Sequence, residues 1–265
     1  MKNPSPALNR PIPNQALTDE QLDRYARHIV LKEIGGAGQQ ALLRSSIIVI
    51  GAGGIGSPAI QYLAAAGIGT LTVIDDDSVS LDNLQRQLLF GTSDVGRPKT
   101  EVAAEAVARL NPEVRFIARP ERLTAGNADG LLAGADLVLD GSDNFATRLA
   151  VSDACTRLQI PLVSAAIGQF LAQIGTFRGW ERDKPCYRCF VGDAFDAEDC
   201  DTCSTLGVLG ALVGIAGSWA AMDAIRQICG FGPDQAGKLH VFDGLTPAMR
   251  TIRIVKDPAC SGCNP

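Results

Sequence analysis

The stretch that decides the fold is Ser46-Ile47-Ile48-Val49-Ile50-Gly51-Ala52-Gly53-Gly54-Ile55-Gly56-Ser57, in which an apolar, β-rich run ends abruptly in glycines. Because an apolar helical pattern follows over 60–66, the stretch predicts a strand, a tight turn and the start of a helix. Gly51, Gly53 and Gly56 have the G-x-G-x-x-G spacing, whose missing Cβ atoms permit the turn, close approach to a phosphate and close helix packing. We therefore predict a nucleotide site at this helix N-terminus, with a turn that serves only packing as the alternative.

Further apolar segments and helical patterns alternate along the chain. Strands are predicted at 70–74, 114–118, 137–140, 161–165 and 173–177, and helices at 99–110, 127–133 and 144–159. This alternation predicts an α/β, Rossmann-like fold with a mostly parallel, doubly wound sheet. Segments 238–242 and 249–256 indicate a C-terminal antiparallel hairpin. Before the first strand, a capped helix is expected to open at Thr18, to end at the glycines of 35–38, and to be followed by a short helix near 39–44.

The length and composition indicate one domain. The chain of 265 residues suits one large α/β domain or two small ones, and no internal repeat or long linker divides it. The proline-rich segment 1–15 has no apolar signal-peptide core, so we predict a disordered lead-in there. We predict a single domain over 16–265, with an embellished C-terminal subregion from about 180 to 265.

The overall charge excludes some partner classes. A net charge of −5 and an isoelectric point near 5.1 give no basic field for nucleic acid or an anionic membrane. The longest apolar run, 206–222, is shorter than the roughly 20 residues of a membrane span and leads into Asp223, so we interpret it as a buried helix. Without an export signal, a cytoplasmic location is expected, in which paired cysteines more often bind metal than form disulfides.

Charged residues near the ends of the predicted strands favour ATP as the ligand. Asp75 ends the second strand roughly 20 residues after the glycine turn, where a dinucleotide fold places the acid that binds a ribose hydroxyl. Arg86 and the segment 97–99 bring cations to the same end of the sheet, and fixed cations suit a triphosphate better than a dinucleotide. Solvated surface cations are the alternative. Asp143 follows the fourth strand and either holds Mg²⁺ or caps the next helix.

Six of the eight cysteines form C-x-x-C pairs. The pairs are Cys186/Cys189, Cys200/Cys203 and Cys260/Cys263. Two such pairs provide the four thiolates of a structural, tetrahedral zinc site. Spacing alone favours the first and second pairs, because they are as close as in a zinc ribbon, but spacing does not settle the choice. Cys155 and Cys229 lie in apolar helical patterns and are predicted to be inert core residues.

Seven features together closely resemble the MoeB/ThiF/HesA family of adenylyltransferases, nearest to its MoeB members, which are related to ubiquitin-activating enzymes. They are Arg24-Tyr25-Ala26-Arg27-His28, the turn 51–56, Asp75-x-Asp77, Asn83-Leu84-Gln85-Arg86, Gly96-Arg97-Pro98-Lys99, Asp140 to Asn144, and the first and third cysteine pairs. The resemblance extends from about 23 to 263, and the Asn-Leu-Gln-Arg element is far more specific than the glycine turn.

The resemblance implies a homodimer that binds Mg·ATP. It would adenylate the C-terminal Gly-Gly of a small ubiquitin-like sulfur carrier, MoaD-like or ThiS-like, releasing pyrophosphate ahead of thiocarboxylate formation. The pathway would be molybdenum cofactor (molybdopterin) biosynthesis, thiamine (thiazole) biosynthesis or a specialised route. Because no rhodanese-like extension follows Pro265, a separate cysteine desulfurase or rhodanese is expected to supply sulfur. The rival reading is a NAD-dependent oxidoreductase, which is disfavoured because neither His28 nor His240 lies in a crevice loop.

The family pattern also implies roles for individual residues. Asp75 would hold the ribose, while Asn83, Arg86 and Lys99 would contact phosphates and stabilise the charge that develops in transfer. Asp143 would bind Mg²⁺, and Arg27 would reach the ATP of the other subunit. The implied nucleotide-binding set is Gly51, Gly53, Gly54, Gly56, Asp75, Asn83, Arg86, Lys99, Asp143 and Asn144.

For zinc, the family pattern selects Cys186, Cys189, Cys260 and Cys263, against the spacing preference. Cys203 would then match the loop cysteine that takes part in thioester or persulfide transfer in some relatives. Two residues depart from the pattern. Asp76 adds negative charge near the triphosphate, and Cys200 gives Cys203 a possible disulfide partner.

Overall fold

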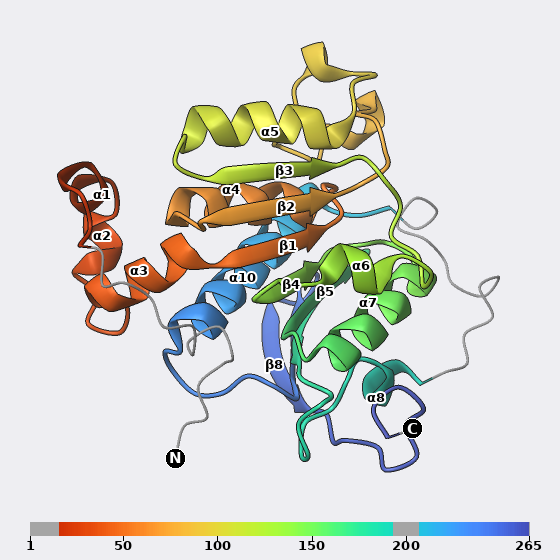
Figure 1. The fold of residues 1–265 in the computed structure, drawn as a ribbon. Helices are drawn as coiled ribbons and strands as arrows, with labels where there is room; N and C mark the ends of the chain where they lie inside the picture. The colour runs from red at the N-terminus through yellow and green to blue at the C-terminus, as the bar shows by residue number, and fades with distance from the viewer. Residues whose placement is uncertain (1–15, 193–206, 265) are drawn as a thin grey trace.

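The computed structural model describes residues 16–192 and 207–264, and its centre is an eight-stranded sheet covered by helices on both faces (Figure 1). The strands are β1 Ser46–Ile50, β2 Thr70–Ile74, β3 Arg115–Arg119, β4 Leu137–Asp140, β5 Leu162–Gly168, β6 Leu171–Phe177, β7 Lys238–Asp243 and β8 Ala248–Arg253. The α-helices are α1 Asp19–Arg24, α2 Ala26–Ile29, α3 Gly35–Arg44, α4 Gly56–Ala66, α5 Lys99–Leu110, α6 Ala128–Leu132, α7 Phe145–Leu158, α8 Arg188–Val191 and α10 Gly210–Cys229.

The sheet has a parallel half and an antiparallel half. Its strand order is β3-β2-β1-β4-β5-β6-β7-β8, with parallel pairing from β3 to β5 and antiparallel pairing from β5 to β8. The predicted C-terminal hairpin is confirmed as β7–β8 and continues the same sheet. Strand β6 is antiparallel because only two residues separate it from β5, whereas a parallel return needs a crossover segment.

The inner strands of the parallel half, β1, β2 and β4, are buried on both faces, whereas the edge strand β3 is partly exposed. In β1, Ile47 and Val49 pack into a core with α4, α5 and α10, while Ile48 and Ile50 pack into a second core with α6 and α7. This double burial explains why β1 is a continuous apolar run rather than an alternating one.

Two details of the N-terminal region differ from the prediction. The glycines at 35–38 do not end a helix but form the first turn of α3. At Gly38 the helix packs closely on α10, since a Cβ there would lie 3.5 Å from the sulfur of Cys229, and this packing opposes the poor helix propensity of glycine. The helix that opens with the predicted capping box at Thr18 is divided at Tyr25, whose buried ring separates α1 from α2.

Helix α10 contains most of the apolar run and packs against α4 and β5. It therefore confirms the interpretation of that run as a buried helix. Within 16–192 and 207–264, the structure has no helix with the length and apolarity needed to cross a membrane.

Candidate active site

A cavity of about 540 Å³ opens where the parallel strands end. Gly51 follows β1, Asp75 follows β2, Gly141 follows β4, and Ala166 lies near the end of β5; all four line the cavity. Open α/β sheets bind ligands at this edge, and the volume is in the range of small-molecule sites. The cavity is therefore the candidate active site.

The glycine turn forms one wall as predicted. Gly51 has φ +85°, a left-handed conformation that glycine adopts without strain. Gly56 lies outside the cavity lining and has the predicted packing role, because a Cβ there would overlap the carbonyl oxygen of Gly51. Gly53 and Gly54 line the cavity and leave their backbone open to a ligand.

Asp75 connects this turn to the end of β2. Its carboxylate accepts hydrogen bonds from the backbone N–H groups of Ala52 (2.6 Å) and Asp77 (2.8 Å). Burial raises the pKa of Asp75, and the positive charge of Lys99 opposes that increase. The neighbouring Asp76 lies outside the lining and accepts a hydrogen bond from Arg122 Nε (2.9 Å) at the surface, so that pairing offsets its additional charge.

Two predicted cations reach the cavity. Lys99 is buried, with 5% of its side chain exposed, and its Nζ lies 2.9 Å from Asp77 Oδ2. Arg86 lines the same cavity, and its Nη1 donates to the carbonyl oxygen of Asp82 (3.1 Å). Arg97 does not line the cavity and instead forms an ion pair with Glu105.

Asn83 shapes this wall through its backbone. Its carbonyl oxygen accepts from the N–H groups of Arg86 and Gln87, both at 3.0 Å, but Asn83 is not among the residues that line the cavity. A side-chain contact from Asn83 to phosphate therefore stays a prediction.

The loop after β4 supplies the predicted carboxylate. Asp143 is exposed and lines the cavity. The helix cap that was the alternative role for Asp143 belongs to Asn144, whose Oδ1 accepts from the N–H of Thr147 (2.9 Å) at the start of α7. Asp143 is thus available as an oxygen ligand, which is the kind of donor that Mg²⁺ prefers.

Several lining residues were not predicted. Arg148 on α7 is buried beside the cavity, and its position one helical turn after the Asn144 cap is the only signal in the sequence. Gln87 is also buried in the wall, and its Oε1 has no hydrogen-bond partner. Phe190 of α8 and Tyr187, which directly precedes that helix, also line the cavity.

The structure does not bring every predicted residue to this cavity. Arg27 is exposed on α2, in the arm that stands away from the sheet (Figure 1), and it does not line the cavity. Cys200 and Cys203 lie outside the described residues. Among the described residues, neither histidine lines the cavity; His28 contacts Gln39, and His240 stacks on Trp219.

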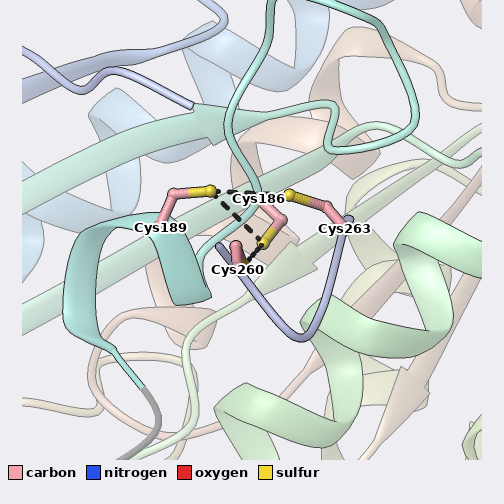
Figure 2. A group of neighbouring side chains, drawn as sticks. All are labelled: Cys186, Cys189, Cys260 and Cys263. Atoms are coloured by element: carbon pink, nitrogen blue, oxygen red, sulfur yellow. Dashed lines mark hydrogen bonds between the residues drawn. The ribbon is translucent and has the colours of Figure 1, made fainter. Parts of the chain in front are cut away.

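Four cysteines gather beside α8, with all their sulfurs within 4.8 Å of one another (Figure 2). They are the set that the resemblance selected, Cys186, Cys189, Cys260 and Cys263. The Sγ–Sγ distances are 3.5 Å for Cys186–Cys260 and for Cys189–Cys263, and 3.8 Å for Cys186–Cys189. Tetrahedral zinc with bonds of about 2.3 Å holds its sulfurs about 3.8 Å apart, so the cluster fits this ion. Cys155 was predicted to be an inert core residue, and the structure confirms this: the side chain is buried, and that burial raises the pKa of its thiol.

Comparisons with known proteins agree on one family. The model of the ThiF family matches residues 25–262. The sulfur carrier protein adenylyltransferase of Thermus thermophilus is 42% identical, over 93% of this chain and 92% of that protein. The molybdopterin-synthase adenylyltransferase of Escherichia coli is 39% identical, over 93% and 98%. A crystal structure of Escherichia coli MccB with MccA has a TM-score of 0.82 and 22% identity, and the match covers 94% of this chain and 76% of that one. At this low identity, the likeness shows only that the two chains share a fold.

Proposed function

The chain belongs to the ThiF family, and from that membership we propose that it adenylates the C-terminal glycine carboxylate of a small sulfur carrier protein with ATP. The observation that carries the proposal is one cavity whose lining includes Gly53, Asp75, Arg86 and Lys99 together. Such a lining offers one nucleotide a backbone that lets its phosphates approach, a carboxylate that accepts a hydrogen bond from a ribose hydroxyl, and two cations.

The proposed reaction is a displacement at the α-phosphorus of ATP. A carboxylate oxygen of the carrier forms a bond to that phosphorus, and the bond from the phosphorus to the β-phosphate oxygen breaks. The products are the acyl-adenylate and pyrophosphate. Arg86 and Lys99 would stabilise the negative charge that develops on the phosphate oxygens, a role that cations perform in phosphoryl transfer. Asp75 would hold the ribose through a hydroxyl hydrogen bond.

Two metals have separate roles in the proposal. Mg²⁺, when bound with ATP, neutralises phosphate charge, and Asp143 is the residue that would hold it. Zn²⁺ would bind the four-cysteine cluster and supply no chemistry, because four protein ligands leave no open position. The close-packed thiols require a reducing compartment, so we also propose a cytoplasmic location.

The partners in the proposal are a carrier ending in Gly-Gly and a second copy of this chain. The arm α1–α2 would carry Arg27 to the ATP of that copy, which explains an exposed arginine that contributes nothing to its own cavity. Sulfur would be supplied by a separate desulfurase or rhodanese. If Cys203 reacts with the activated carrier, it does so from the segment outside the described residues.

Exchange of labelled pyrophosphate into ATP tests the activity directly. The wild-type protein should exchange only when a Gly-Gly carrier is present, and Arg86→Ala should reduce the rate by about 100-fold or more, as expected for a lost charge-stabilising donor. Arg97→Ala is the matched control, because Arg97 lies nearby but outside the cavity. Carrier-independent exchange, or equal rates in Arg86→Ala and wild type, would refute the proposal.

A further inference from the structure

We infer that Arg148 is a positioning residue that fixes the loop 141–144 and thereby directs Asp143 toward the phosphates of Mg·ATP. The inference rests on the proposed function, since it concerns the same cavity. It assigns a role to a buried arginine that lines the cavity but that the adenylation scheme above leaves unused.

Arg148, on α7, makes hydrogen bonds to the loop after β4 and to strand β5 beside the cavity. Its Nη2 donates to the carbonyl oxygens of Ser142 and Ala165, the latter at 2.9 Å, and its Nη1 donates to Ser164 Oγ (3.1 Å). The contact with Ser142 is the important one, because Ser142 directly precedes Asp143. The guanidinium thus ties the loop after β4 to β5, with its planar group spanning both.

Asp140 holds the same loop from its other side. Its Oδ1 accepts from the N–H (3.0 Å) and the Oγ (2.7 Å) of Ser142, and its Oδ2 lies 3.7 Å from Arg148 Nη1. Ser142 is therefore hydrogen-bonded to Asp140 through its N–H and hydroxyl, and to Arg148 through its carbonyl oxygen. The loop also packs on the glycine turn, because a Cβ on Gly51 would lie 3.3 Å from the carbonyl oxygen of Gly141.

The position of Asp143 depends on these hydrogen bonds to Ser142. In the part of the chain that the structure describes, no hydrogen bond to its carboxylate is found, although it lines the cavity. The backbone of the loop therefore sets the place from which this carboxylate reaches into the cavity. A carboxylate that must hold a cation needs such outer support, and loss of the supporting partners of a metal ligand weakens metal binding by about 10- to 100-fold.

Stability alone does not explain this buried ion pair. Only 7% of the Arg148 side chain and none of the Asp140 side chain is exposed, so both charges lose their hydration. A buried pair is often no more stable than apolar residues of similar volume, whereas removing one partner leaves a costly unpaired charge. The arrangement is better explained by the orientation that it imposes on the loop.

The test measures binding rather than turnover. Calorimetry gives the affinity for α,β-methylene-ATP with and without MgCl₂, and the ratio of the two is the Mg²⁺-dependent gain. Arg148→Lys keeps the positive charge but loses the planar guanidinium that donates to Ser142, Ser164 and Ala165. We expect it to reduce this gain about 10-fold or more, while binding without Mg²⁺ is unchanged. Asp143→Ala should abolish the gain. Arg157→Lys, an exposed arginine on the same helix, should leave it at the wild-type value.

A second variant guards against misfolding. Asp140→Asn with Arg148→Met removes both charges, so no unpaired charge is buried, and it should fold while showing the same reduced gain. A wild-type gain in either folded Arg148 variant, or in Asp143→Ala, would overturn the inference. Failure of the proposed function is distinguishable, because wild type would then show the Mg²⁺-dependent gain without carrier-dependent pyrophosphate exchange.

Discussion

Lys99 shows at the residue scale how burial prepares a charge for a ligand. It is the first residue of α5, its side chain is almost fully buried, and its ammonium group has an ion pair with the exposed Asp77. A buried ammonium with one carboxylate partner retains hydrogen-bonding capacity, since it has three donors. A phosphate that enters the cavity beside Asp77 would meet a cation whose position is already fixed.

We predict that Lys99→Met reduces pyrophosphate exchange by about 100-fold or more, because it removes a preorganised cation from the cavity. The methionine retains the apolar stem, so thermal unfolding should change little. Lys238→Met, on β7 and away from the lining, is the control. Exchange kinetics at saturating carrier give the comparison, and a rate near wild type would exclude a role for Lys99 in transfer.

Residue roles were predictable where a linear motif carries them. Gly51, Asp75 and Lys99 each follow a recognisable strand end or helix start, so their convergence follows from the topology. Arg148 was missed because its position one helical turn after the Asn144 cap does not distinguish a buried arginine from an exposed one. The cap at Asn144 was not separable from Asp143 for a related reason, since adjacent polar residues at a helix start have the same preference.

The cysteine cluster belongs to the scale of elements, because it joins α8 to the C-terminal loop. We predict that Cys260→Ser with Cys263→Ser loses bound zinc and lowers the unfolding temperature, since the metal closes a long loop and its binding energy contributes to folding. Cys200→Ser with Cys203→Ser should retain one zinc per chain. Metal analysis of the purified variants decides, and the reverse pattern would restore the shorter spacing as the zinc site.

Helix α10 carries a carboxylate whose burial makes stability depend on pH. Burial raises the pKa of Asp223 from 3.8 to about 6, against the opposing effect of Arg226. One of its oxygens is buried without a hydrogen-bond partner. Because the folded state binds the proton more tightly than the unfolded state, this group destabilises the protein as pH increases from about 4 to about 6, and the full cost, about 3 kcal/mol, applies above that range.

We therefore predict that Asp223→Asn is more stable than wild type near neutral pH and that the difference shrinks as pH decreases toward 4. Urea unfolding across this range measures the free energy of unfolding of both proteins. Asp183→Asn, at an exposed position, should show no such trend. A difference that is constant with pH would show that folding does not raise the pKa of this carboxyl group.

Strands with a long apolar run were the most predictable elements. The boundaries of helices and the direction of strands were the least predictable. Strands β1, β2 and β4 appear where their apolar runs predict them, whereas the first turn of α3 is hidden by glycines whose packing against α10 involves residues far apart in sequence. The antiparallel direction of β6 depends on a two-residue connection at Gln169, which has φ +46°. Such a conformation is uncommon for glutamine, so composition gave no signal for it.

At the scale of the whole molecule, the arm α1–α2 is attached firmly although it projects from the sheet. The hydroxyl of Tyr25 accepts from Asn111 Nδ2 (2.9 Å) and donates to Glu113 Oε2 (3.1 Å), and its ring fills the space left by Gly67. This anchoring holds Arg27 at a fixed place outside its own cavity. In the dimer that we propose, a second subunit would receive that side chain.

We predict that Arg27→Ala and Arg86→Ala, each inactive alone, recover exchange when the two chains are co-expressed. In a mixed dimer with sites completed across the interface, one site carries both defects and the other carries none. Random pairing should therefore restore about a quarter of the wild-type activity. Co-expression of Arg86→Ala with Lys99→Met, which both act within one subunit, should restore nothing. No recovery in the first mixture would place Arg27 in its own subunit.

Helix α8 is shared between two parts of the molecule, and this has a practical effect on any assay. Cys189 belongs to the four-cysteine cluster, Phe190 and Val191 line the cavity one and two residues later, and the guanidinium of Arg188 forms an ion pair with Asp153 on α7. If the cluster holds zinc as proposed, we expect a partly loaded preparation to be a mixture of molecules with intact and altered cavities. Specific activity should be normalised to bound zinc rather than to protein concentration, and culture conditions would otherwise appear as differences in catalytic rate.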